Sequence, residues 1–122
     1  MRTNDLKKLI QTKLKTITTD VYYEVASDDA LYPHIVFDFD SINLGDLSRQ
    51  DYMLNIDVWS NGKNTKPIDD MCDSIEELLQ GQNLPQENIL PTFYLVDRRT
   101  VPDQDKDIKH RLIRFQVQNY VR

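Results

Sequence analysis

The sequence is poor in the residues and motifs from which disulfides, metal sites and catalytic sites are built. Only one of the 122 residues is cysteine, Cys72, which excludes an internal disulfide and a cysteine-cluster zinc site. The three glycines form no glycine-rich phosphate loop. A zinc site at the two histidines, His34 and His110, would need two further carboxylate ligands. No Ser-His-Asp arrangement follows from the spacing. We therefore expect no enzymatic activity, no cofactor and no metal.

Long hydrophobic runs are also missing. No apolar stretch approaches the ~20 residues that a membrane-spanning helix needs, and the N-terminal MRTNDLKKLIQTK lacks the hydrophobic region of a signal peptide. We expect a protein made in a cytoplasm, with no membrane partner, that leaves it only as part of a larger assembly. The length fits a single domain over residues 1–122, large enough to fold without disulfides or metal.

Charge is unevenly distributed along the chain. The formal net charge of -5 argues against a general nucleic-acid binder. Residues 1–15 carry five bases and one acid, residues 20–57 nine acids and one base, and residues 98–122 seven bases and three acids. Such unlike patches steer protein surfaces together, although the same charges are equally able to cancel within one fold.

Two segments have the periodicity of amphipathic helices. Residues 4–17 place apolar side chains at helical spacing and lysines on the remaining face. The second helix starts after Thr65, an N-cap followed by Pro67, and ends near Gln80 before Gly81. Its apolar stripe consists of Ile68, Met71, Cys72, Ile75, Leu78 and Leu79. On this stripe Cys72 is expected to behave as a small buried hydrophobe and not as a nucleophile.

Five segments have strand patterns, and together with the helices they predict the fold. They are residues 21–26, 33–40, 52–60, 92–96 and 112–121. The stretch SINLGDLSRQ (41–50) and the charged span 97–111 are predicted to be connections. The order α-β-β-β-α-β-β predicts a two-layer α+β domain: a mostly antiparallel sheet of 4–5 strands with both amphipathic helices on one face.

The strand in YMLNIDVWSNGKN (52–64) raises the question of what covers its second face. One side is wholly apolar and belongs to the core: Tyr52, Leu54, Ile56 and Val58. The other side carries Met53, Asp57 and the only tryptophan, Trp59. Methionine and aromatic side chains are favoured at interface centres, so another subunit or a second sheet could cover them. The alternative is that the loop 41–50 folds over them within one chain.

Two acidic clusters are weighed as chemical sites. Asp38, Asp40 and Asp57 form a possible acidic patch on the non-helix face of the sheet, with no pocket or partner base to suggest acid–base catalysis. The pattern D-x-D-x-D at 103–107 is similar to the start of a calcium loop. An EF-hand also needs glycine at position six and glutamate at position twelve, where this chain has Ile108 and Arg114. Solvated carboxylates are the simpler interpretation of both clusters.

A basic span near the C-terminus offers two interpretations. It consists of Arg98, Arg99, Lys106, Lys109, Arg111 and Arg114. With Tyr94 and Tyr120 as stacking groups, it could form a nucleic-acid stripe. Because three aspartates interrupt it, a charged hairpin that pairs with another chain fits as well or better.

Two short motifs stand out in the predicted order of elements: Tyr32-Pro33 leading into Val36, and Val58-Trp59-Ser60 before the second helix. Together with the N-terminal helix and the two closing strands, they resemble a known family over nearly the whole chain. It is the family of small tail-completion or head–tail joining proteins of long-tailed bacteriophages, related in fold to tail terminators.

The resemblance implies a non-enzymatic structural protein of a bacteriophage or prophage, located in the virion. Family members assemble as a ring, commonly of six subunits, between the head connector and the tail tube, and DNA passes through the lumen. The implied partners are further copies of the chain, a connector or head-completion protein and a tail-tube protein; DNA is not specifically bound. In such a ring the candidate contact residues are Met53, Trp59, Arg98, Arg99, Lys109 and Arg111. An acidic lumen lets phosphates slide because it repels them, and its candidate wall is Asp38, Asp40 and Asp57.

Two other functions fit the same residues. One is a cytoplasmic α+β protein-binding module. The other is a small nucleic-acid-binding protein that uses the basic span 98–114, for which salt-sensitive DNA binding would be the sign.

Overall fold

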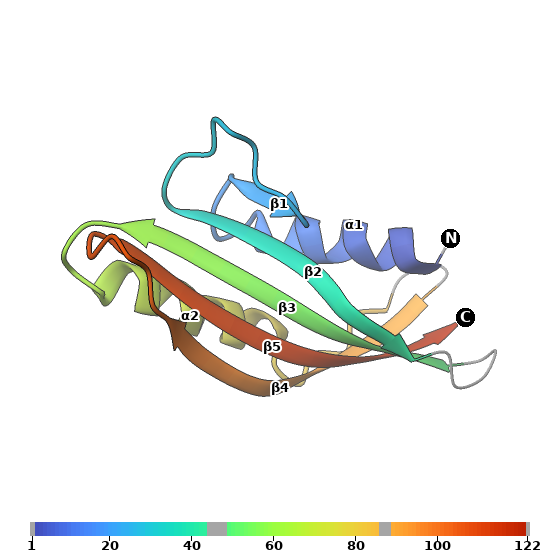
Figure 1. Cartoon of the computed structure of the whole chain (residues 1–122). Coiled ribbons are helices and arrows are strands. Elements are labelled where there is room, and N and C mark those ends of the chain that lie inside the picture. The colour runs from blue at the N-terminus through green and yellow to red at the C-terminus, as the bar shows by residue number, and fades with distance from the viewer. Residues whose placement is uncertain (1, 44–48, 86–88, 122) are drawn as a thin grey trace.

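The structure, a computed structural model, describes residues 2–43, 49–85 and 89–121, and its elements follow the predicted order (Figure 1). They are α1 (Arg2–Leu14), β1 (Val21–Tyr23), β2 (His34–Asn43), β3 (Arg49–Asn61), α2 (Lys66–Leu79), β4 (Ile89–Val101) and β5 (Ile108–Val121). The strands form one sheet in the order β1-β2-β3-β5-β4. β1 runs parallel to β2, and the other neighbours pair antiparallel. The predicted α+β fold is confirmed.

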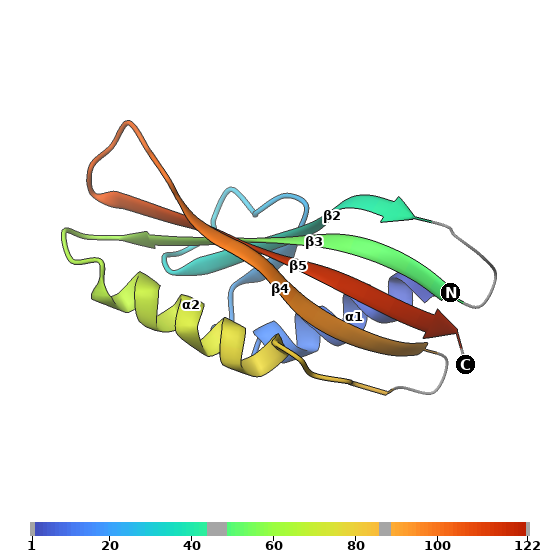
Figure 2. The same ribbon diagram turned by 90° about the horizontal axis from the view of Figure 1, so that it is seen from below.

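The domain has two layers. Both helices lie on one face of the sheet, and no helix covers the other face over the residues described here (Figure 2). We call this second face the open face. Neither α1 nor α2 is long and apolar enough to cross a membrane.

The core fills the space between the helices and the sheet. Along β3, buried and half-buried residues alternate from Arg49 to Ser60, as a strand with one face on a core requires. The helices bury the apolar residues that their periodicity predicts: Leu6, Ile10 and Leu14 from α1, and Ile68, Cys72, Ile75 and Leu79 from α2. Each large apolar side chain buried in this way contributes about 1.5–3 kcal/mol.

Several predicted boundaries differ from the structure, two of them near the N-terminus. The first helix ends at Leu14 and not at residue 17. β1 ends at Tyr23 and not at residue 26, because Glu24 adopts a left-handed backbone conformation with φ 67° that a strand cannot continue.

Other differences lengthen the strands. β2 extends to Asn43 and β3 begins at Arg49, so the predicted ten-residue connection 41–50 is wrong at both ends; residues 44–48 lie outside the described part. Most of the predicted connection 97–111 is also strand, since β4 continues to Val101 and β5 starts at Ile108. In both places ladder pairing with β5 or β3 outweighs the polar composition of the segment.

The N-terminus of α2 is capped by a residue that the sequence pattern did not single out. Thr65 occupies the N-cap position, as predicted, but its side chain makes no capping hydrogen bond. Instead, Asn64 Oδ1 accepts a hydrogen bond of 2.9 Å from the backbone N–H of Lys66. This bond satisfies one of the N–H groups that the first turn of a helix leaves free.

Candidate functional site

The open face carries a row of three rings at the end of the sheet near the β1–β2 loop. In the strand register, Trp59 of β3 lies between His34 of β2 and His110 of β5. The rings of Trp59 and His110 stack with centroids 3.7 Å apart and planes at 15°, and those of Trp59 and His34 are 6.1 Å apart at 14°. Adjacent strands therefore bring together two histidines that are 76 positions apart in sequence (110 − 34).

Hydrogen bonds fix both histidine rings. His110 donates from Nε2 to Asp57 Oδ1 at 2.7 Å, and its side chain is only 11% exposed. His34 donates from Nδ1 to the carbonyl oxygen of Leu31 at 3.2 Å. Burial lowers the pKa of His34 because the charged imidazolium is poorly solvated there. At neutral pH His34 is therefore an uncharged ring.

The side chains of His34, Trp59 and His110 form the floor of a pocket of about 500 Å³, which we call the aromatic pocket. The β1–β2 loop supplies one wall, and the open face supplies the rest. The lining residues are Glu24, Val25, Ala26, Tyr32, His34, Val36, Asp57, Trp59 and His110. Beside it, Val25 and Leu31 of the same loop are 77% and 70% exposed, which is high for large apolar side chains. Apolar side chains clustered on a surface mark a contact site for another molecule.

The three predicted acidic residues lie on or beside the open face. Asp38 accepts a hydrogen bond of 3.2 Å from Asn55, while Asp40 is exposed at a β-bulge. Burial chiefly raises the pKa of Asp38, and the negative charges of Asp57 and Asp40 add to this effect. The structure thus brings these carboxylates close enough to interact, although Asp57 is also bound to His110.

The basic span is largely neutralised within the chain. Arg98 points to the helix side of the sheet and contacts three carboxylates of α2: Asp69 at 3.4 Å, Asp73 at 2.7 Å and Glu76 at 2.6 Å. Arg111 pairs with Asp69 at 3.3 Å. These two predicted contact residues are thus already engaged within their own chain.

The remaining predicted contact residues form no ion pair with α2 in the described part of the chain. Arg99 lies in β4, has a 55% exposed side chain and pairs only loosely with Asp97 at 3.3 Å. Lys109 is half-buried and donates to the carbonyl oxygen of Lys106. Met53, also half-buried, lies opposite Gln116 in the ladder. Arg114 forms a bidentate ion pair with Asp97, with both hydrogen bonds at 3.0 Å. This pair further reduces the number of unpaired positive charges in the basic span.

The aspartates of the β4–β5 hairpin stabilise the turn itself. Asp103 and Asp105 each accept a hydrogen bond of 2.9 Å from the backbone N–H two residues ahead. Among the described residues, no group of three or more His, Cys, Asp or Glu side chains is arranged to hold a metal ion. Cys72 is fully buried, and burial raises the pKa of its thiol to about 11, which keeps it protonated at neutral pH.

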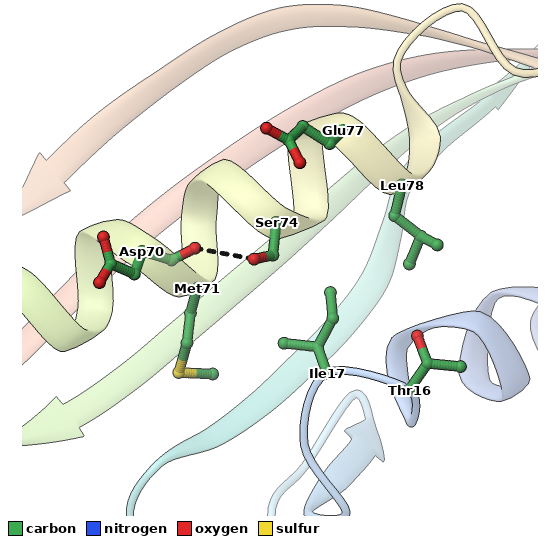
Figure 3. Close-up of a pocket in the computed structure, with 7 residues that line it drawn as sticks. All are labelled: Thr16, Ile17, Asp70, Met71, Ser74, Glu77 and Leu78. Atoms are coloured by element: carbon green, nitrogen blue, oxygen red, sulfur yellow. Dashed lines mark hydrogen bonds between the residues drawn. The ribbon is translucent and has the colours of Figure 1, made fainter.

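A second hollow, of about 580 Å³, lies between the two helices (Figure 3). Ile17, Met71 and Leu78 provide its apolar surface, and Ser74 donates a hydrogen bond of 3.0 Å to the carbonyl oxygen of Asp70 at its edge. Met71 and Leu78 are partly buried and pack against the core. The hollow therefore lies where the residues after α1 approach α2. Its polar groups do not point toward one common position, as those of a ligand site would.

Comparisons with known proteins agree with this fold. The family model described as "Tail completion protein gp17" matches residues 8–118 of the chain. A chain in a structure titled "Virion of native gene transfer agent (GTA) particle" shares the fold, with a TM-score of 0.65 at 11% sequence identity. That match covers 88% of this chain and 84% of the other chain. The curated proteins include no significant match.

Proposed function

The chain belongs to the tail completion protein family, and from this premise we propose that it assembles as a hexameric ring at the joint between phage head and tail. In this role it is a structural, non-enzymatic virion component, and DNA passes through the lumen of the ring without being specifically bound. The family match over residues 8–118 carries the proposal, because it spans nearly the whole chain. The fold shared with a chain of a gene transfer agent virion supports it.

The open face supports a role in assembly. A sheet surface without a helical layer, bordered by the exposed Val25 and Leu31, has apolar area that contact with another protein would bury. We place contacts to neighbouring copies, to a connector or head-completion protein and to a tail-tube protein on Met53, Trp59, Arg99 and Lys109.

Two residues contribute to the ring indirectly. Because Arg98 and Arg111 bind the carboxylates of α2, their part is to fix α2 on the sheet. With so much of the basic span paired, DNA binding through it is disfavoured.

We place the lumen wall on the acidic part of the open face. Asp38 and Asp40 are its principal residues, since Asp57 is held by His110. A wall of carboxylates repels the phosphate backbone and leaves the DNA mobile.

The test is a deletion of the gene from the phage or prophage genome that carries it, followed by complementation with an epitope-tagged copy. We expect the deletion to yield filled heads and separate tails, and the tagged chain to be labelled at the head–tail joint in electron micrographs. Joined, infectious particles without the chain would contradict the proposal. So would labelling at any other part of the particle.

A further inference from the structure

The N-terminal helical segment carries two exposed lysines that form no ion pair in the described part of the chain. The arginines of β4 and β5 all form ion pairs within the chain: Arg98, Arg99, Arg111 and Arg114. By contrast, Lys8 and Lys15 are exposed and have no carboxylate partner among the described residues. Because they are seven residues apart, they lie on the same face of the helical segment. We call Lys8 and Lys15 the lysine stripe.

Exposed carboxylates lie beside the aromatic pocket. Glu24 lines this pocket, and Asp28 and Asp29 follow in the same loop, which contains no base from residue 24 to residue 33. All three side chains are exposed. Asp57 adds a fourth carboxylate at the pocket floor. The pocket therefore combines aromatic rings, exposed aliphatic side chains and negative charge.

These two surfaces lie on opposite faces of the domain. The lysine stripe belongs to the helical segment in the helix layer, which lies on one face of the sheet (Figures 1 and 2). The aromatic pocket is lined by side chains of the open face and of the β1–β2 loop. Two complementary patches that face in opposite directions cannot meet within one chain. They can meet between copies, head to tail, and a contact of this kind closes into a ring when the rotation per copy permits.

We propose that the lysine stripe of one copy docks into the aromatic pocket of the next copy. This assignment rests on the proposed ring and names the two surfaces that form its repeating contact. The lysine stems lie against Val25 and Leu31, and an ammonium group reaches the carboxylates of Glu24 and Asp57.

The chemistry of the pocket suits a lysine better than it suits an acidic or a purely apolar group. An ammonium over Trp59 or Tyr32 gains a cation–π interaction of about 0.5–2 kcal/mol, more as water is excluded. Lysine stems are apolar, so they cover aliphatic side chains while the charged end reaches a carboxylate. Arg98, Arg111 and Arg114 of the basic span are not available for this position, because their side chains are held in ion pairs by their own chain.

A charge-swap experiment tests the contact. The first variant reverses the lysine stripe (Lys8→Glu with Lys15→Glu), the second reverses the loop (Glu24→Lys with Asp28→Lys), and the third combines both. Each is supplied in trans to the gene deletion, and joined head–tail particles are counted. We expect each reversal alone to lower the count at least about tenfold, because like charges then face each other. The combined variant restores opposite charges and should recover the count to within about threefold of wild type.

The control has the same change of charge elsewhere: Lys63→Glu with Lys106→Glu, both exposed and outside the lysine stripe. It should assemble as wild type does. Urea unfolding of every purified variant verifies that the reversals leave the fold intact, since all substituted side chains are exposed.

Zero-length carbodiimide cross-linking of wild-type particles supplies a second readout. Links between Lys8 or Lys15 and Glu24, Asp28 or Asp29 of different copies are expected. Normal assembly of the lysine-stripe variant, or failure of the combined variant to recover, overturns the docking proposal and leaves the ring itself standing. Absence of the wild-type chain from joined particles overturns the ring, and the docking proposal with it.

Discussion

At the scale of single residues, Arg98 is the charged side chain with the most partners in the described chain. Its side chain is 26% exposed, and its guanidinium contacts Asp69, Asp73 and Glu76. Removing it leaves Asp73 and Glu76 of α2 without a counter-charge, while Asp69 keeps its pair with Arg111. Arg98→Ala is therefore expected to lower the free energy of unfolding by about 2 kcal/mol, between the values typical of exposed and buried pairs.

Arg99→Ala is the matched control for this prediction, and urea unfolding measures both. Arg99 is 55% exposed and has one loose pair, with Asp97, so its removal should cost less than about 0.5 kcal/mol. Equal losses for the two variants would show that the contacts with α2 do not stabilise the fold.

His34 gives the fold a dependence on pH. Burial lowers its pKa, so the unfolded chain binds a proton more readily than the folded chain. Stability should therefore fall as the pH drops below the ordinary histidine pKa of about 6.5. His34→Phe removes this titration, and we expect the variant to lose less stability than wild type between about pH 7.5 and 5.5.

Urea midpoints at these two pH values, measured for both proteins, check the prediction. The hydrogen bond between His110 and Asp57 is present in both proteins. The same loss of stability in wild type and His34→Phe would contradict the assignment to His34.

The stacked side chains of His34, Trp59 and His110 show how far single residues of the site could be predicted. Alternation places Trp59 on the face away from the core, and the same pattern places His34 there. Their proximity depends on which residue of β2 lies opposite which residue of β3, and register is a property of paired strands. His110 fell within a predicted connection, so its place beside Trp59 had no signal in the local sequence.

At the scale of elements, the start of α2 depends on the side chain of Asn64. Its Oδ1 accepts a hydrogen bond from the N–H of Lys66, whereas the side chain of Thr65 makes no such bond. Asn64→Ala should therefore lower the free energy of unfolding by about 1 kcal/mol, as typical for the loss of a cap. Thermal or urea unfolding measures it, with Thr65→Ala as the control. A larger loss for Thr65→Ala would identify Thr65 as the effective cap.

Elements with a clear hydrophobic periodicity were predictable from the sequence. Strand segments that depend on hydrogen-bonded pairing with a neighbouring strand were not. The apolar stripe of α2 and the alternation of β3 identified both elements correctly, because each buries one face against the core. The second half of β4 has a polar and charged sequence and was predicted to be a connection. It is a strand because it pairs with β5, and because Arg98 and Arg114 find carboxylate partners on either side of the sheet.

At the scale of the whole molecule, ion pairs formed on folding decide which of the charges in the sequence remain unpaired at the surface. The N-terminal and C-terminal parts are equally basic in sequence, each with a surplus of four positive charges (5 − 1 and 7 − 3). Four arginines of the C-terminal part are paired through α2 and Asp97, while Lys8 and Lys15 of the N-terminal part stay exposed. Two-layer architecture and fold class were predictable from element order, whereas the free charge was not, since it depends on contacts between distant segments.

The proposed acidic lumen leads to a prediction for the assembled ring. Asp40 is exposed at the bulge of β2, so Asp40→Lys should leave folding and the number of joined particles unchanged. Six added lysines on the wall of a hexameric ring would replace repulsion of the phosphate backbone with attraction. DNA ejection should then slow, by about tenfold at low salt and less at high salt, because binding to phosphates releases counterions. Asp107→Lys, at the exposed β4–β5 hairpin, is the matched control. Ejection kinetics triggered in vitro measure the effect, and equal rates for the two variants at low salt would place Asp40 away from the path of the DNA.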